Sequence, residues 1–567
     1  MYNAFDFLFF LGTLLGVMAV GFWTGRQEKK SVSGYFRGGN QLPWYAIGFS
    51  IVAAGISSEQ FVGEMGYAYK LGMPVVNWEW LVFPALSVLL WIFVPLYVRH
   101  GITTMPEYLQ KRFGPHTRTI YAYLSTVSYI FVNFALVFYT GGYALEQMWG
   151  LDRLWAVWGL ALLTGLYTVY GGLSAVAWTS SLQCILLLGG GLYVFFSGMC
   201  AIQWDFRAML GEGQQAHLAV PADHPEVPWP ALIILALSTN PWYYAANQYI
   251  NQRCLAARDE WHAKMGVLFA GGLQLLIPLA TCFPAMAYRV IQPALSDHNA
   301  AYPALVAAFV PVGLRGLVAA AIVGAIMSTI SGLVNSTSTI VTLDIVRRGV
   351  GRDWSEERLV RVGRWSGAAA LLIGALFAPV VMRWESLFRY AQDIWAPMAA
   401  PVVVVFLAGA LWEKADRRGA NCCLWLALFT VPLTLTKSLL ADRGIHFLPE
   451  NLENPMVLAG AVSLASWALM AVFSLVRSWA AALALAALGW GLIGLIAVQS
   501  PAATALLLAA VMGLTVGWPL VRRKAPAAAL WDRSMLQTPG QRPWYGNLSF
   551  WWGLFAGVLG FLYFLFW

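Results

Sequence analysis

Acidic and amide side chains occur in a stretch of otherwise small and apolar residues, positions 50–66, which reads SIVAAGISSEQFVGEMG. Apolar runs long enough to cross a bilayer flank it. A carboxylate at membrane depth costs about 2.5–3.5 kcal/mol, so a helix that only anchors the protein would not keep Glu59 and Glu64. Glycines let the backbone leave helical geometry, and freed carbonyls can then hold a cation. The stretch predicts a broken helix at a transport site; a kinked packing helix, with Glu59 paired to a neighbour, is the alternative.

The composition indicates a polytopic all-α membrane protein in the lipid bilayer. Of the 567 residues, 59% are hydrophobic and 11% are charged, against about 25% charged residues in soluble domains. Apolar runs recur from end to end and predict about 16 transmembrane helices. The net charge of +8 falls in short loops, so it indicates topology and no nucleic-acid partner. The six cysteines show no metal-ligand spacing and no disulfide framework, and no obligatory protein partner is evident.

Loop charges predict the orientation. With sixteen spans, all the basic loops lie on one side, which the positive-inside rule makes cytoplasmic. Both termini are then extracytoplasmic, in a cell (cytoplasmic or inner) membrane. The predicted divisions are 1–43, a first span and cytoplasmic loop; 44–200, inverted repeat one; 201–227, an extracellular loop; 228–411, inverted repeat two; 412–476, two further spans; 477–548, two extra spans and a cytoplasmic loop; and 549–567, a final span.

Two later segments are predicted to be interrupted as well. Segment 306–345 is dense in Gly, Ser and Thr, and segment 386–411 is broken by Gln392, Asp393 and Pro397. Interrupted segments in both halves point to an inverted-repeat transporter with a binding site near the bilayer midplane.

The neighbouring hydroxyls of Ser328 and Thr329 offer oxygen ligands of the kind that a hard cation such as sodium prefers. Backbone carbonyls of Ala325 and of an unwound segment 53–56 would bring the number of oxygens to about five. Taken alone, however, these residues are better explained by close helix packing, with hydroxyls bonding back to the preceding turn.

Eight motifs resemble the sodium/solute symporter family, most of all its bacterial sodium/sugar (glucose/galactose-type) branch. They are AAGISSEQFVGEMGYAY, NWEW, GITTMPEYLQKRFG, GGYALE, YGGLSAVAWT, NQYINQRCLAAR, NSTSTI and FLYFLFW. The resemblance covers about residues 1–440 and 549–567. It implies a LeuT-like five-plus-five inverted repeat with extra spans before and after.

The resemblance also implies two sets of site residues. The sodium ligands would be the carbonyls of Ala53, Ile56 and Ala325 and the hydroxyls of Ser328 and Thr329. The substrate-binding positions would be Gln60, Glu79, Asn240, Gln392 and Gln274, with Trp78 and the lid residue Tyr243. Amides and a carboxylate suit the hydroxyls of a sugar, and aromatic faces suit its C–H surfaces.

Five positions depart from the family pattern. Gly55, Val82 and Gln274 stand where the sugar transporters have Asn, Ser and Lys, so the pocket is expected to contact its solute differently. Ser180 stands where an Asp is usual, and Gly332 where a Ser accompanies that Asp. Both of these are associated with a second sodium ion in some relatives, so we expect one sodium ion per cycle.

The expected function is sodium-coupled symport of a monosaccharide into the cell by alternating access. The alternatives are symport of another small polar solute, such as a sialic acid, inositol or nucleoside, or sodium-independent sugar uniport. A membrane sensor that binds sugar without net transport is a further alternative. It is less expected, because such a sensor would usually carry a soluble signalling domain. An enzyme is not expected, because the sequence shows no paired carboxylates with a nucleophile, no glycine-rich phosphate loop and no metal spacing.

Overall fold

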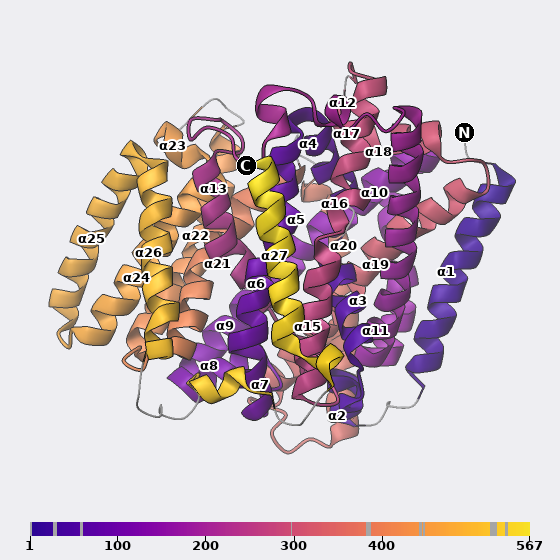
Figure 1. The fold of residues 1–567 in the computed structure, drawn as a ribbon. Helices are drawn as coiled ribbons and strands as arrows, with labels where there is room; N and C mark the ends of the chain where they lie inside the picture. The colour runs from indigo at the N-terminus through magenta and orange to yellow at the C-terminus, as the bar shows by residue number, and fades with distance from the viewer. Residues whose placement is uncertain are drawn as a thin grey trace.

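The computed structural model describes residues 3–26, 31–56, 60–295, 297–381, 387–441, 445, 448–521, 530–538 and 543–567. Within these ranges the protein is all-α, as predicted, with two isolated bridges and no strand (Figure 1). Its first half contains α1 (Ala4–Thr24), α2 (Val32–Arg37), α3 (Trp44–Gly55), α4 (Met65–Leu71), α5 (Asn77–Trp80), α6 (Val82–Val88), α7 (Val94–Arg99), α8 (Met105–Phe113), α9 (Pro115–Ser128), α10 (Ala135–Trp149), α11 (Arg153–Ala201), α12 (Phe206–Leu210), α13 (Trp229–Ile234), α14 (Gln248–Leu255) and α15 (Glu260–Gln274). Its second half contains α16 (Ile277–Ala280), α17 (Cys282–Ile291), α18 (Ala301–Phe309), α19 (Leu314–Ile340), α20 (Glu356–Val381), α21 (Leu387–Leu411), α22 (Arg417–Ala441), α23 (Glu450–Glu453), α24 (Pro455–Leu475), α25 (Trp479–Gln499), α26 (Pro501–Val521) and α27 (Leu548–Phe566).

Eleven helices of the described residues are long and apolar enough to cross a membrane. The number rises to twelve if the bent pair Glu260–Gln274 and Ile277–Ile291 is one span. α11 contains a kink at Gly172, where φ is +61° and ψ −155°. The total of sixteen spans stays a prediction, since these criteria pass over helices that are broken into short pieces.

The first predicted break is confirmed. α3 ends at Gly55, Ile56 is extended (φ −105°, ψ 120°), and the chain resumes as a π-helical turn, η2 (Gln60–Glu64), before α4. Unwinding begins at Ile56 and not at Ala53, which keeps its place in α3. Residues 57–59, which include Glu59, lie outside the described residues.

The second break lies elsewhere than predicted. α13 continues through the π-helical segments η7 (Leu235–Thr239) and η8 (Trp242–Ala246) to Asn247, which is extended (φ −91°, ψ 128°), and α14 follows. The interruptions predicted at the polar residues of 306–345 and 386–411 were wrong, because α19 and α21 are continuous there. Segment 306–345 also begins inside α18, which the turn at Gly313 (φ +93°) separates from α19.

Side-chain contacts explain both outcomes. In α19, Ser336 and Thr339 each donate a 2.7 Å hydrogen bond to a carbonyl of their own helix, so their hydroxyls need no break. At the second break, the Tyr129 hydroxyl donates to the Asn247 side chain, and the Tyr121 hydroxyl donates to the Ala246 carbonyl over 2.7 Å. Two tyrosines distant in sequence thus satisfy the backbone and side-chain groups at the interruption.

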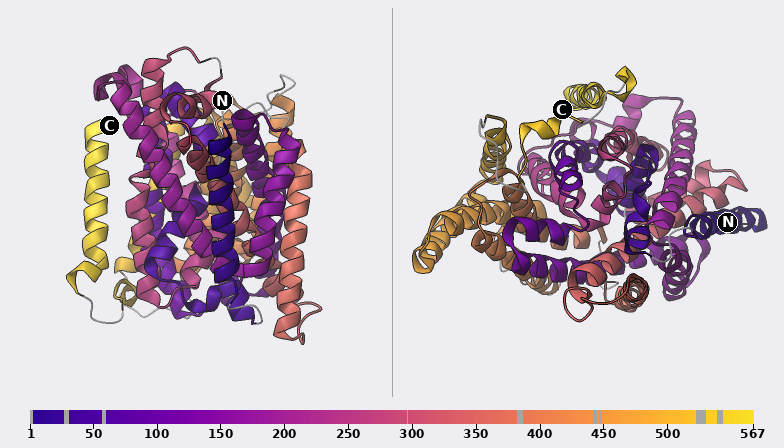
Figure 2. Two further views of the ribbon diagram at one scale, coloured as in Figure 1. Left: turned by 90° about the vertical axis from the view of Figure 1, so that its right-hand side faces the viewer. Right: turned by 90° about the horizontal axis from the view of Figure 1, so that it is seen from below.

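The bundle has a buried centre and an exposed apolar rim. The apolar window of the span Leu314–Val346 is 94% buried, against 17% for α25 and 11% for α27. α1 and α25 lie at opposite edges of the molecule in both the side view and the view from below (Figures 1 and 2). Both chain ends lie at one end of the bundle, opposite α2 and α8 (Figure 1). Which membrane face each end occupies stays a prediction.

Candidate functional site

A cavity of about 90 Å³ lies where the two broken helices meet α19 and α21. It brings together six of the seven predicted substrate-binding side chains and one predicted sodium ligand. These seven residues are Gln60, Trp78, Glu79, Asn240, Tyr243, Gln392 and Thr329. The seventh substrate position, Gln274, is buried behind the cavity wall and reaches it through a neighbour.

Gln60 connects the two sides of the first break. Its Nε2 donates a 2.9 Å hydrogen bond to the Gly55 carbonyl, which the end of α3 leaves outside the helical pattern. Gly55 has no room for the side chain that the resemblance expects there. A Cβ at Gly55 would lie 2.8 Å from the Tyr244 hydroxyl, so Tyr244 fills that space.

Two buried carboxyl groups face the cavity. Glu79 on α5 accepts a hydrogen bond from the Gln274 amide of α15, and Glu64 lines the same cavity. Glu64 in turn accepts a 3.1 Å hydrogen bond from the Cys282 thiol. Sequence reasoning assigned no role to Glu64 in the site, although the residue lies in the polar stretch that predicted the first break.

Asn240 and Gln392 present unmet hydrogen-bonding atoms to the cavity. Each residue is 8% exposed, and neither Asn240 Nδ2 nor Gln392 Oε1 has a hydrogen-bond partner. A buried polar atom without a partner costs about 1–3 kcal/mol. One donor and one acceptor are therefore ready for a polar solute that supplies both kinds of group.

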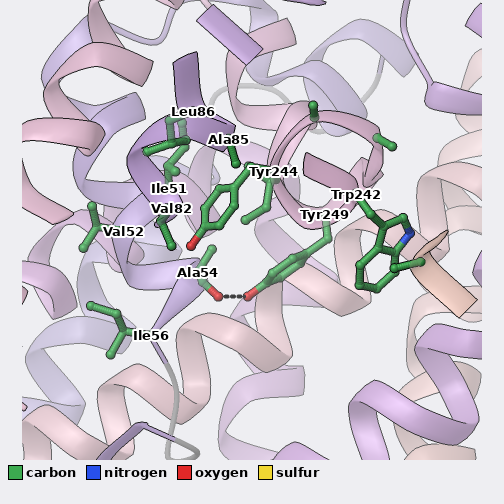
Figure 3. Packing of buried hydrophobic residues seen from close by; sticks show 14 of the residues in the cluster. Ile51, Val52, Ala54, Ile56, Val82, Ala85, Leu86, Trp242, Tyr244 and Tyr249 are labelled. Atoms are coloured by element: carbon green, nitrogen blue, oxygen red, sulfur yellow. Dashed lines mark hydrogen bonds between the residues drawn. The ribbon is translucent and has the colours of Figure 1, made fainter. Parts of the chain in front are cut away.

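Tyrosines fasten the second broken helix to the first. The Tyr249 hydroxyl donates to the Ala54 carbonyl over 2.5 Å (Figure 3), and the Tyr243 hydroxyl contacts the same carbonyl over 3.3 Å. The Tyr243 ring also lies 6.4 Å, between centroids, from that of Trp395 on α21. Tyr243 therefore touches both a broken helix and α21, whereas Tyr249 was not predicted from sequence.

The predicted sodium ligands come from two helices that pack together, α3 and α19. Ala325, Ser328 and Thr329 share one turn of α19, where Thr329 Oγ1 donates to the Ala325 carbonyl over 3.2 Å. Ala53 and Ile56 lie at the end of α3 and are buried. Neutral carbonyl and hydroxyl oxygens at a helix C-terminus, where the dipole is negative, suit a monovalent hard cation.

Two neighbours of this region were not predicted as contacts. Ser328 Oγ donates to Ser180 Oγ over 2.7 Å, so the residue that replaces the usual Asp touches a predicted ligand. A Cβ at Gly332 would lie 2.9 Å from Arg253 Nη2 and 2.5 Å from the Tyr249 ring. The fully buried Arg253 side chain, which also donates to Ser50 Oγ over 2.7 Å, thus holds a positive charge beside Gly332.

Comparisons with known proteins all find sodium-coupled symporters. The model of the sodium:solute symporter family matches residues 35–427. A sodium/glucose cotransporter of Vibrio parahaemolyticus is 34% identical over 435 residues, which cover 71% of this chain and 80% of that protein. The sodium/myo-inositol cotransporter 2 of Oryctolagus cuniculus is 34% identical over 460 residues, which cover 73% and 67%. The substrate-bound, outward-open structure of a Na⁺-coupled sialic acid symporter has the same fold, with a TM-score of 0.66, 21% identity and coverage of 89% and 98%.

Proposed function

The chain belongs to the sodium:solute symporter family, and we propose that it carries a monosaccharide into the cell together with one sodium ion. The choice of a sugar rests on two buried atoms without hydrogen-bond partners, Asn240 Nδ2 and Gln392 Oε1. A sugar hydroxyl both donates and accepts, so it can satisfy the amide donor and the amide acceptor alike. Glu79 and the partly buried Trp78 ring complete a site with the polar and apolar groups that a sugar ring needs.

Sodium would bind the carbonyls of Ala53, Ile56 and Ala325 and the hydroxyls of Ser328 and Thr329. This set joins α3 to α19, so sodium stabilises the conformation in which these helices are close. Coupling requires only that sodium binds one conformation better than the other. One charge moving through about 100 mV supplies about 2.3 kcal/mol, which is enough to drive uptake.

The transport cycle follows from this arrangement. Sodium and sugar bind from outside, the proposed repeats 44–200 and 228–411 rock against each other, and Tyr243 leaves the solute path toward the cytoplasm. The first broken helix lies near the start of repeat one and the second near the start of repeat two, as an inverted repeat requires. Both termini would face outward from the cytoplasmic membrane.

A single sodium ion per cycle agrees with the contacts of Ser180 and Gly332, the two residues that differ from the family pattern at this place. Ser180 supplies a neutral hydroxyl in place of a carboxylate, and the Arg253 guanidinium lies against Gly332. A fixed cation at this position opposes a second sodium ion.

An anionic solute is disfavoured by the charges of the cavity. Glu64 and Glu79 line it, and none of its described lining residues is Lys, Arg or His. A sialic acid would therefore meet two buried carboxyl groups and no basic side chain among the described lining residues.

Uptake into proteoliposomes tests the proposal. A panel of labelled sugars is offered with inward sodium, proton or potassium gradients. We expect accumulation of a monosaccharide only with sodium, with a sodium Hill coefficient near one. Sodium-independent equilibration would show a uniporter instead, and accumulation of inositol or a nucleoside without any sugar would change the solute class.

A further inference from the structure

An apolar groove of about 490 Å³ lies between α11 and α20, away from the transport cavity, with which it shares no described lining residue. Its walls carry large exposed side chains: Leu162 is 64% exposed, Leu166 50% and Leu372 51%. Both helices are long and apolar enough to cross a membrane. The exposed side chains therefore face the hydrocarbon of the bilayer, and the groove is open to lipid.

The length of the groove matches one leaflet of a bilayer. Along α11 it extends from Trp158 to Tyr170, which is about 18 Å at 1.5 Å per helical residue. Half of the hydrocarbon thickness of a bilayer is about 15 Å. One acyl chain can therefore lie in the groove from the middle of the membrane to its surface.

A guanidinium group closes the groove at its Tyr170 end. Arg364 on α20 is the single charged side chain among the described lining residues, and its Nε is buried without a hydrogen-bond partner. In the described part of the chain no acidic side chain forms an ion pair with Arg364. A buried N–H on a cation is costly to leave unmet, so this end of the groove suits an anionic acceptor.

Tyr35 on α2 fixes the position of this guanidinium. Arg364 Cζ lies 5.6 Å from the centroid of the Tyr35 ring, and the Tyr35 hydroxyl donates to the carbonyl of the groove residue Val169 over 3.0 Å. α2 packs against both α11 and α20 and lies at one end of the bundle (Figure 1). The charged end of the groove is thus at the membrane surface, where lipid headgroups lie.

An apolar slot that ends in a guanidinium group has the order of parts that a phospholipid needs. We propose that this groove binds an anionic phospholipid, with one acyl chain between α11 and α20 and the phosphate group on Arg364. The planar fork of an arginine matches the oxygens of a phosphate. A zwitterionic lipid also carries a phosphate, but its ammonium group brings a second positive charge toward Arg364 and should weaken its binding.

The lipids that stay bound after extraction test the site. The full chain is reconstituted in vesicles of equal parts dioleoyl-phosphatidylglycerol and dioleoyl-phosphatidylcholine and extracted in detergent, and the lipids retained per chain are counted by mass spectrometry. One basic side chain near a membrane surface favours an anionic lipid by about fivefold, so phosphatidylglycerol should be retained in that excess. The measurement needs neither sodium nor a sugar, so its result is independent of the proposed function.

Two variants test the two parts of the site. Arg364→Gln should reduce the excess to about twofold or less. Its matched control, Arg352→Gln, removes an equal charge from an exposed position before α20 and should keep the excess. Ala368→Phe places a ring in the groove and should lower the retained phosphatidylglycerol by about half or more, because the ring takes the space of the chain. Ala369→Phe, at an exposed position outside the groove, should leave it unchanged.

The Tm of each variant in lipid-free detergent should match that of the wild type, which separates loss of the site from misfolding. Equal retention of the two lipids by the wild type would overturn the proposal. An excess that falls as far in Arg352→Gln as in Arg364→Gln would also overturn it, because the total basic charge would then explain the binding. A chain that is extracted as a dimer without retained lipid would assign the groove to a second copy instead.

Discussion

The side-chain amide of Gln274 on α15 donates a hydrogen bond to the buried carboxylate of Glu79 on α5. Gln274 stands where the sugar transporters that the chain resembles have a lysine. The replacement keeps a donor for Glu79 but brings no positive charge to it. It also shows that Gln274 acts on the cavity through Glu79 and does not line it.

The proposed sodium ligands are tested by removing their hydroxyls. Ser328→Ala and Thr329→Ala each take away one of five proposed oxygens, and hydrogen-bond-like contacts to a charge are worth about 1.5–3 kcal/mol. The sodium concentration for half-maximal uptake should therefore rise by about tenfold or more.

Ser336→Ala is the control for these variants, because Ser336 Oγ donates only to the Gly332 carbonyl of its own helix, over 2.7 Å. Its sodium dependence should equal that of the wild type. An unchanged sodium titration in Ser328→Ala and Thr329→Ala would remove both hydroxyls from the ligand set.

The unmet amide donor is tested with Asn240→Ala. Because Asn240 Nδ2 has no partner in the protein, its loss should not destabilise the fold but should cost the solute one hydrogen bond, which raises KM by about tenfold. Sodium affinity should stay within about twofold. The control Ser238→Ala, whose hydroxyl pairs with that of Ser463 over 2.8 Å, should leave KM unchanged. The reverse pattern, a KM effect in the control alone, would refute the assignment.

A buried ion pair holds α21, which carries Gln392. Lys437 on α22 is 4% exposed and contacts Asp393 over 3.2 Å, and its Nζ also donates to the Glu453 carbonyl over 2.7 Å. Lys437→Met leaves the carboxylate of Asp393 without this cation and should destabilise the protein by about 3–5 kcal/mol, seen as a lower Tm in detergent.

Lys437→Met/Asp393→Asn removes both charges and should restore most of the lost Tm, because no uncompensated acid remains at position 393. A double variant no more stable than the single one would mean that Lys437 acts through Glu453 instead.

The space at Gly332 is tested with Gly332→Ala. The added Cβ would lie 2.5 Å from the Tyr249 ring and 2.9 Å from the Arg253 guanidinium. Overpacking of this kind costs about 1–3 kcal/mol and should also reduce uptake, because Tyr249 holds the Ala54 carbonyl. Gly12→Ala on α1, where nothing lies within 4 Å of the new Cβ, is the matched control. Equal Tm and uptake in both variants would argue against a filled site.

Sequence reasoning placed the first break well and the second badly, for a physical reason. Around residue 56, glycines and polar side chains at membrane depth are local signals of an interrupted helix. At Asn247 the interruption depends on Tyr121 and Tyr129, more than a hundred residues earlier in the chain. The Ser- and Thr-rich segment of α19 gave a false signal because its hydroxyls bond back to the helix.

The amino-acid sequence by itself determined the helical membrane class, the first broken helix and the residue types of the site, because apolar run length, glycine content and motif spacing are local properties. Only the tertiary structure decided how these residues interact. It joined Glu79 to Gln274, put Arg253 against Gly332, and left Asn240 Nδ2 and Gln392 Oε1 without partners. Such pairings join helices that are distant along the chain, so they follow from packing, which no local pattern encodes.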